Sequence, residues 1–197
     1  TGEEPVRGYW GGLRIYQSKS PLNLLDHVTI EYGGGYWDAN LYLSGSSAHP
    51  CQVAVTNCVL RESETHGLYS NLYATMTVFS GNMLTANTRG AARMDVNCVG
   101  DLDDSSTYIG NDYDVIEIWG STLEYDANWP AIDVWYLCEG SIGVDAALTI
   151  APGASIMFEA GGQMSVSASG SITAVGTAAF PIILSGAQEV VGYWGGL

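Results

Sequence analysis

Positive charge is scarce in this sequence. Lys19 is the only lysine, and six Lys and Arg residues stand against 21 Asp and Glu, so the 197-residue chain carries a formal net charge of −15. Nucleic-acid binding needs clustered cations that neutralise phosphates, and anionic membrane surfaces attract the same kind of charge. The composition therefore argues against nucleic acid and membranes as partners. It favours an acidic, solvated surface.

Long apolar runs, short cysteine spacings and tight hairpin signals are also missing. No run approaches the ~18 apolar residues that a membrane-spanning helix needs. No Cys-x-x-Cys pair occurs, which argues against a zinc ribbon or a thioredoxin-type motif. Neither Asn-Gly nor Asp-Gly, the strongest signals of a two-residue β-hairpin, is present. The sequence thus excludes a spanning helix and disfavours sheets built from hairpins.

Four cysteines are spread through the chain, at Cys51, Cys58, Cys98 and Cys138. Four cysteines allow three pairings, and their spacing does not select one. In an exported protein we expect one or two disulfides. The alternative is that all four are small buried apolar side chains.

One segment occurs twice. Residues 8–13 read Gly-Tyr-Trp-Gly-Gly-Leu, and residues 192–197 have the same sequence. The flanking residues also agree in part, so that residues 185–197 repeat residues 1–13. We interpret residues 1–197 as a single unit. It is either one repeat of a tandem array or a subunit whose two ends are built alike.

A finer rhythm of short strands lies between the two copies. Most apolar runs alternate with small polar residues at period two, and helical periodicity is nearly absent. Gly, Asn, Ser and Asp separate the runs and tolerate the bends between them. The pattern predicts an all-β, parallel β-helix with coils of roughly 20–30 residues. The expected strands cover residues 13–16, 28–32, 41–43, 53–60, 76–79, 115–119, 148–150, 155–158, 164–167, 171–175 and 181–184.

Four motifs together carry a family resemblance: residues 148–153 (Leu-Thr-Ile-Ala-Pro-Gly), 170–182, 192–196 and 28–34. Their succession resembles bacterial secreted or surface right-handed parallel β-helix proteins, which are often tandemly repeated. The resemblance implies a β-helix fold and an extracellular or cell-surface location. Relative to the repeat of that family, this chain is circularly shifted and begins in mid-repeat.

An acidic cluster is the candidate metal site. Hard cations such as Ca²⁺ take six to eight oxygen ligands from carboxylates and carbonyls. If neighbouring coils bring two acidic stretches together, they supply such ligands, although no cofactor is required by the sequence. The alternative is a set of exposed turn residues that bond the local backbone. The candidate ligands are Asp101, Asp103, Asp104, Asp112 and Asp114.

The same aspartates are candidates for catalysis. Parallel β-helices include pectin-type lyases and polygalacturonase-like hydrolases, and glycoside hydrolysis needs two carboxylates across a sugar bond. His66-Gly67 is similar to the His-Gly turn of polygalacturonases, but it precedes the Asp pair instead of following it. The Arg-x-Lys element of that family is absent as well. We therefore expect a protein that is not an enzyme, with a polysaccharide lyase or hydrolase as the second alternative.

Aromatic residues form the other suggestive feature. Tyr36 and Trp37, flanked by glycines and an aspartate, are candidate glycan contacts, because exposed aromatic rings stack on sugars. Tyr9 and Trp10 recur in a fixed motif and are expected to stack on equivalent rings of neighbouring coils.

The end-to-end repeat favours a structural role. We expect an extracellular solenoid unit that stacks head-to-tail on copies of itself or on adjacent repeats. Its alternative is a carbohydrate-binding or adhesin module whose partner is a polysaccharide. The expected assembly interface consists of Tyr9, Trp10, Gly11, Gly12, Leu13, Tyr193, Trp194, Gly195, Gly196 and Leu197.

Overall fold

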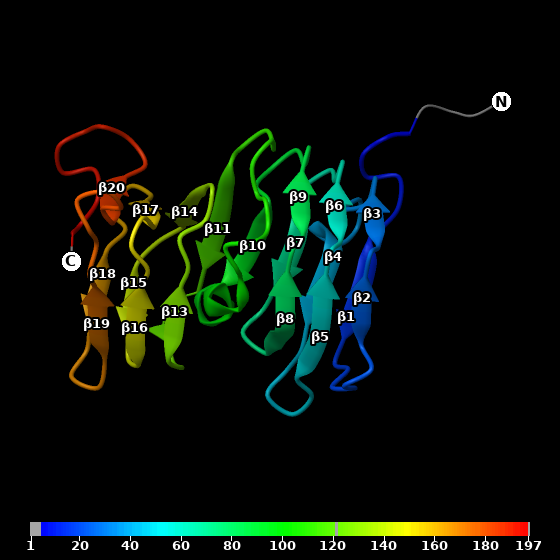
Figure 1. Ribbon diagram of the computed structural model, residues 1–197, viewed down its shortest axis with the longest axis horizontal. Helices are drawn as coiled ribbons and strands as arrows, with labels where there is room; N and C mark the ends of the chain where they lie inside the picture. Colours follow the sequence, from blue (N-terminus) through cyan, green and yellow to red (C-terminus); the bar gives the residue numbers. More distant parts are fainter. Residues whose placement is uncertain (1–4, 121, 197) are drawn as a thin grey trace.

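Parallel pairing between strands one coil apart builds the whole molecule. The computed structural model describes residues 5–120 and 122–196, and all strand pairs within this part are parallel. The chain winds into a β-solenoid of about 7 turns with coils of about 24 residues. Figure 1 shows the coils side by side, with β1 and β20 at opposite ends of the column. The expected all-β parallel solenoid is confirmed.

One sheet runs the full length of the column, and we call it the long sheet. It contains eight strands in the order β1-β4-β7-β10-β11-β14-β17-β20. Their bounds are β1 Leu13–Tyr16, β4 Ala39–Ser44, β7 His66–Ser70, β10 Ala92–Asp95, β11 Val115–Trp119, β14 Trp135–Cys138, β17 Ser155–Phe158 and β20 Ile183–Gly186.

The other faces differ between the two halves of the column. The first half has two three-stranded sheets, β2-β5-β8 and β3-β6-β9. Their strands are β2 Leu24–Asp26, β5 Cys51–Thr56, β8 Ala74–Ser80, β3 Thr29–Glu31, β6 Val59–Arg61 and β9 Met83–Thr85. The second half has the sheets β12-β15-β18 and β13-β16-β19. Their strands are β12 Thr122–Leu123, β15 Ile142–Val144, β18 Met164–Val166, β13 Ala127–Trp129, β16 Ala147–Ile150 and β19 Ser171–Ala174.

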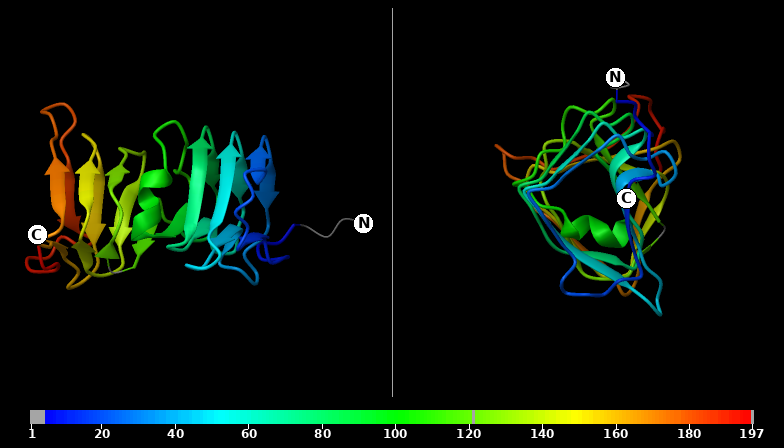
Figure 2. Two further views of the ribbon diagram at one scale, coloured as in Figure 1. Left: turned by 90° about the horizontal axis from the view of Figure 1, so that it is seen from below. Right: turned by 90° about the vertical axis from the view of Figure 1, so that its right-hand side faces the viewer.

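A 3₁₀ turn marks the change between the halves. This turn, η1 (Val96–Asp101), packs against β8 on one side and against β13 on the other. Asp95 caps it by accepting a hydrogen bond from Asn97 N–H at 3.0 Å. In Figure 2 it is the green helical ribbon within the column.

Alternating side chains place the core inside the coils. In β5 the residues Cys51, Val53 and Val55 are buried, and the residues between them are half-buried. Register between coils then aligns the inward residues in columns, so that each coil covers the apolar face of the next. One such column of the long sheet comprises Leu13, Leu41, Leu68, Ala92, Ile116, Tyr136, Ile156 and Leu184.

Single left-handed residues turn the corners of the first half. Tyr32, Glu62 and Ala86 follow β3, β6 and β9 with φ of 60°, 54° and 56°, and Gly110 takes the same corner one coil later with φ of 92°. This conformation costs a residue with a Cβ about 1–2 kcal/mol. It is retained because the strands on both sides are held by their neighbours in the stack.

Candidate functional site

The first copy of the duplicated segment lies against the coil that follows it. Residues 8–11 run beside residues 32–37, the corner between β3 and β4, and four backbone hydrogen bonds join the two segments. The bonds are Gly8 N–H to Gly33 O (3.2 Å), Trp10 N–H to Tyr32 O (3.5 Å), Gly35 N–H to Trp10 O (3.1 Å) and Trp37 N–H to Gly11 O (3.3 Å).

The second copy lies against the coil that precedes it. Residues 193–196 run beside residues 161–164, the corner that leads into β18. Trp194 also stacks on the buried Phe158, with ring centroids 4.9 Å apart and an interplanar angle of 3°. The backbone bonds are Gly161 N–H to Tyr193 O (2.7 Å), Gly195 N–H to Gly162 O (2.7 Å) and Met164 N–H to Gly196 O (3.1 Å).

The two copies have the same local conformation. Gly8 and Gly192 have φ of 78° and 76°, and Gly12 and Gly196 have φ of 94° and 92°. In both copies the tyrosine N–H donates to a valine carbonyl three residues earlier, at 3.2 Å for Tyr9 and 3.0 Å for Tyr193. The described part of the hexapeptide therefore folds alike in two different surroundings. Leu197 lies outside the described residues.

The expected stacking of Tyr9 and Trp10 is wrong for the described residues. Tyr9 is 78% exposed and Trp10 is 43% exposed, and neither ring stacks on another ring. Trp10 instead donates its indole N–H to the carbonyl of Glu31 at 2.8 Å. A backbone acceptor on the following coil holds this ring, so no partner ring is needed.

An aromatic row follows the outer face of the long sheet. Tyr42 and Tyr69 come from successive coils and are stacked at 4.4 Å with an interplanar angle of 2°. Trp37, in the corner that leads into β4, lies 5.3 Å from the Tyr42 ring. Trp119 continues the row at 6.0 Å from Tyr69, and the Arg14 guanidinium lies 4.1 Å from the Trp37 ring. Burial raises the pKa of Tyr69. Because these rings cover one another, the row is chiefly a packing device.

Tyr36 stands at the edge of this row. Its ring meets Trp37 edge to face at 4.6 Å and is 78% exposed, whereas Trp37 is half-buried beneath it. Of the two candidate glycan contacts, only Tyr36 therefore presents most of its surface to solvent.

A buried ionic cluster adjoins the aromatic row. Glu117 of β11 lies 2.9 Å from His66 Nε2, and its carboxylate also receives Arg89 Nη2 at 3.2 Å and Arg93 Nε at 3.7 Å. Arg93 pairs in turn with Glu139 at 2.7 Å. Burial acts to raise the pKa of Glu117, but the hydrogen bond from His66 and the nearby positive charges outweigh it, so the pKa is lowered.

Sequence reasoning missed this cluster. Arg93 and Glu117 are register partners on adjacent strands, one coil apart in the sequence. The only signal in the sequence is that spacing, and it carries information only after the coil length is known.

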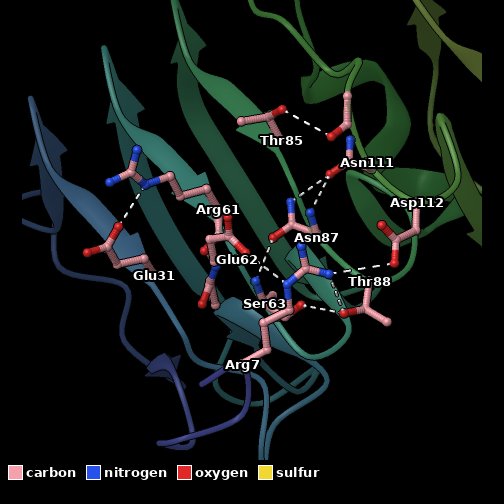
Figure 3. Close-up of polar contacts among 12 residues, drawn as sticks. Arg7, Glu31, Arg61, Glu62, Ser63, Thr85, Asn87, Thr88, Asn111 and Asp112 are labelled. Atoms are coloured by element: carbon pink, nitrogen blue, oxygen red, sulfur yellow. Dashed lines mark hydrogen bonds and ion pairs between the residues drawn. The ribbon is translucent and has the colours of Figure 1, made fainter. Parts of the chain in front are cut away.

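The five candidate calcium ligands are not brought together. No group of three or more His, Cys, Asp or Glu side chains in residues 5–120 and 122–196 is arranged to hold a metal ion. Asp112 lies 3.6 Å from Arg7, and Figure 3 shows this pair at the corner of the first half. Asp114 accepts the backbone N–H groups of Gly110 and Asn111 at 2.7 and 2.8 Å. These two aspartates thus bond the chain itself, as turn aspartates do.

Asp101 and Asp103 also bond the chain itself. Asp101 accepts the N–H of Met76 at 2.7 Å, and burial raises its pKa to about 6 despite this bond. The carboxylate of Asp103 accepts hydrogen bonds from the backbone N–H and the hydroxyl of Ser105. Asp104 is exposed. Asp103 and Asp104 line an open groove of about 620 Å³, whereas His66 contacts Glu117 on the long sheet.

The expected disulfides are wrong. All four cysteines are free and buried. The thiols of Cys51, Cys58 and Cys98 each lie close to a backbone carbonyl; that of Cys98, for example, lies 3.1 Å from Asn71 O and 3.2 Å from Ala74 O. Burial raises the pKa of Cys51, Cys98 and Cys138, which keeps these sulfurs in the unreactive thiol form. The cysteines are therefore small core residues.

No helix within residues 5–120 and 122–196 combines the length and the apolar composition needed to cross a membrane. Comparisons with protein-family models, with curated proteins and with solved structures found no match. Functional inference therefore rests on the geometry of the coils and of the duplicated segment.

Proposed function

We propose that this chain is a structural β-solenoid unit that stacks head-to-tail on further copies of itself. The observation that carries the proposal is that, within the described residues, no further coil covers the first or the last coil of the column. The bacterial, extracellular or cell-surface location is part of the same proposal and rests on the sequence resemblance to secreted repeat proteins.

The backbone at both ends is ready for further pairing. β1 and β20 are the outermost strands of the long sheet, and each pairs with a neighbour on one side only in the described part of the chain. An unpaired strand edge is a template for another strand, and soluble proteins usually block it with charge, proline or a covering element.

The apolar column is uncovered at the same places. Leu41 and Leu68 in the interior of the column are fully buried, whereas Leu13 in β1 and Leu184 in β20 are only half-buried. Stacked coils gain stability from their nearest neighbours, so a further coil at either end would complete the burial of these leucines. At roughly 25 cal/mol per Å² of apolar surface, such burial favours association.

A pair of matched variants tests the proposal. Leu184→Glu places a charge in the inward column of the last coil, while Ser185→Glu places the same charge on the outer face of the same strand. We expect electron microscopy of a polypeptide in which residues 1–197 are followed directly by residues 14–197 of a second unit to show one continuous rod. Leu184→Glu in the first unit should divide this rod into two bodies, and Ser185→Glu should leave it continuous. Two separate bodies in the unaltered polypeptide would contradict the proposal.

Glycan binding is a second candidate, favoured by one observation. Tyr36 is 78% exposed beside a row of otherwise mutually covered rings. If it stacks on a sugar, Tyr36→Ala should weaken retention on a polysaccharide column and leave assembly unchanged. Tyr113→Ala, which also removes an exposed tyrosine, is the control. We do not propose a polysaccharide lyase or hydrolase, because Asp103 and His66 are already engaged by the chain itself.

A further inference from the structure

We infer that neighbouring units share a single copy of the duplicated segment. At this joint β1 of the next unit pairs with β18 of the preceding unit, and not with β20 of the long sheet. In this arrangement residues 192–196 of one unit and residues 8–12 of the next are the same stretch of chain. The inference rests on the proposed head-to-tail stacking and specifies its geometry.

The two copies use different backbone groups. The first copy bonds the following coil through Gly8 N–H, Trp10 N–H, Trp10 C=O and Gly11 C=O. The second copy bonds the preceding coil through the groups that correspond to Tyr9 C=O, Gly11 N–H and Gly12 C=O. No group appears in both sets. The backbone groups of one segment therefore suffice for both sets of bonds at once.

The tryptophan side chain is divided in the same way. Trp10 uses its indole N–H to bond Glu31 O on the following coil, at 2.8 Å. Trp194 uses a ring face to stack on Phe158 of the preceding coil, at 4.9 Å. Because the backbone conformation of the copies agrees, each copy shows one side of a joint whose other side is supplied by the next unit.

The chain between β20 and the end of the second copy is short. Each coil of the long sheet joins two paired residues by a segment of chain. The segment from Ile116 to Tyr136 is among the shortest of these. Leu184 lies on β20, and the leucine of the second copy stands at position 197 of the sequence. The segment from position 184 to position 197 is much shorter than the one from Ile116 to Tyr136. It is therefore too short to circle the column and return to the long sheet, and the strand that begins at this leucine must lie on the next face.

The register of the second copy identifies that face. Gln163 and Gly196 form a parallel bridge immediately before β18. The residue after Gly196 corresponds to Leu13, so the bridge places β1 of the next unit on β18. In this register Arg14 of the next unit lies opposite Ser165. By the same succession β2 follows β19, and β3 follows β20.

A cross-linking experiment tests this register directly. The probe is one polypeptide in which residues 1–197 are followed by residues 14–197 of a second unit. One variant combines Ser165→Cys in the first unit with Arg14→Cys in the second. Its matched control combines Ser185→Cys with the same Arg14→Cys, because Ser185 and Arg14 belong to one outward row of the long sheet. Disulfides need Cα atoms about 4.4–6.8 Å apart, as in adjacent strands.

We expect the Ser165 variant to form its disulfide under mild oxidation at least about tenfold faster than the Ser185 variant, measured by peptide mass mapping. Faster cross-linking through Ser185 would overturn the joint and leave head-to-tail stacking intact. If neither pair cross-links and small-angle scattering shows two separate bodies instead of one rod, both the joint and the proposed function fail. If neither pair cross-links in a continuous rod, the joint alone fails.

Discussion

The two halves of this solenoid close their corners in different ways. In the first half, buried asparagines bond the backbone of neighbouring coils. In the second half, beyond Ala147, side-chain hydrogen bonds of the described residues stay within three residues of the chain. Both halves nevertheless stack in the same parallel arrangement, so the solenoid fold does not require hydrogen bonds from buried asparagines to neighbouring coils.

Asn87 shows how the first half works. Its Oδ1 accepts the N–H of Ser63 at 3.0 Å, and its Nδ2 donates to Leu60 O at 3.2 Å and to Asn111 Oδ1 at 2.8 Å. Figure 3 shows Asn87 between Ser63 and Asn111 on successive coils. The two intervals between these three residues are equal, and Asn82 repeats the pattern with Cys58 N–H at 2.9 Å. A ladder of this kind requires coils of constant length.

Coil length changes in both halves. In the first half the interval from Leu13 to Leu41 is longer than the one from Leu68 to Ala92. Along the long sheet the intervals from Ile116 to Tyr136 and from Tyr136 to Ile156 are equal and short, whereas the interval from Ile156 to Leu184 is longer. Large buried rings, those of Trp129, Tyr136 and Phe158, fill this part of the core. The ladder spans the equal coils between Ser63 and Asn111. The equal coils from Ile116 to Ile156 have no such ladder, because none of the described residues after Glu117 is a buried polar residue, and apolar packing takes its place.

Removing a ring from the second half gives the largest expected effect. Phe158 is fully buried and is stacked against Trp194. Phe158→Ala should lower the free energy of unfolding by about 4 kcal/mol in urea titrations. Hydrogen exchange should show the loss in β17–β20 while the first half keeps its protection. Phe180→Ala, at a ring that is 64% exposed, serves as the control and should change stability by less than about 0.5 kcal/mol.

Breaking the asparagine ladder should have the next largest effect. Asn87→Ala leaves the buried N–H of Ser63 and the carbonyl of Leu60 without partners, and should cost about 3 kcal/mol. Asn128→Ala, at an exposed asparagine of the second half, should cost less than about 0.5 kcal/mol. Chemical denaturation of both variants measures the two losses. Equal losses at the two positions would mean that buried amides do not distinguish the halves.

The ionic cluster on the long sheet predicts a pH dependence. The folded-state pKa of Glu117 is lowered, so its contribution to stability is present above the unfolded value of 4.5 and is lost as the pH falls through the folded value. Glu117→Gln weakens the hydrogen bonds to a charged carboxylate and should cost about 2 kcal/mol at pH 7, and the difference from the unaltered protein should shrink steadily below pH 4.5. A difference that stays constant from pH 7 to strongly acidic pH would contradict this role.

The smallest effect is expected at the boundary between the halves, and its sign is opposite. Burial raises the pKa of Asp101 from 3.8 to about 6, so the ionised carboxylate destabilises the fold as the pH rises through this window. Asp101→Asn keeps an acceptor for Met76 N–H and should stabilise the protein by about 1 kcal/mol at pH 7. Thermal unfolding should show no gain below about pH 4, where the carboxyl is protonated in both states.

Sequence patterns located most strands but not the corners between them. The run 53–60 reads as one strand, yet the structure divides it into β5 and β6, because Asn57 takes a left-handed conformation with φ of 53°. Asparagine tolerates this conformation, but its place within an alternating run concealed the corner. The aromatic row was equally hidden, since Tyr42 and Tyr69 lie on different coils and only the register makes them stack.

The amino-acid sequence by itself determined the all-β class, the repeat of the glycine-rich hexapeptide and its backbone conformation. These properties depend on local alternation and on glycines that adopt positive φ wherever the segment lies. Only the tertiary structure decided which residues meet across coils. It separated the four cysteines and the candidate aspartates, brought His66, Arg89 and Arg93 to Glu117, and placed each copy of the duplicated segment against a different coil. The physical reason is that partners across coils are separated by the length of the coil between them. This length differs along the column, so spacing in the sequence does not identify the partners.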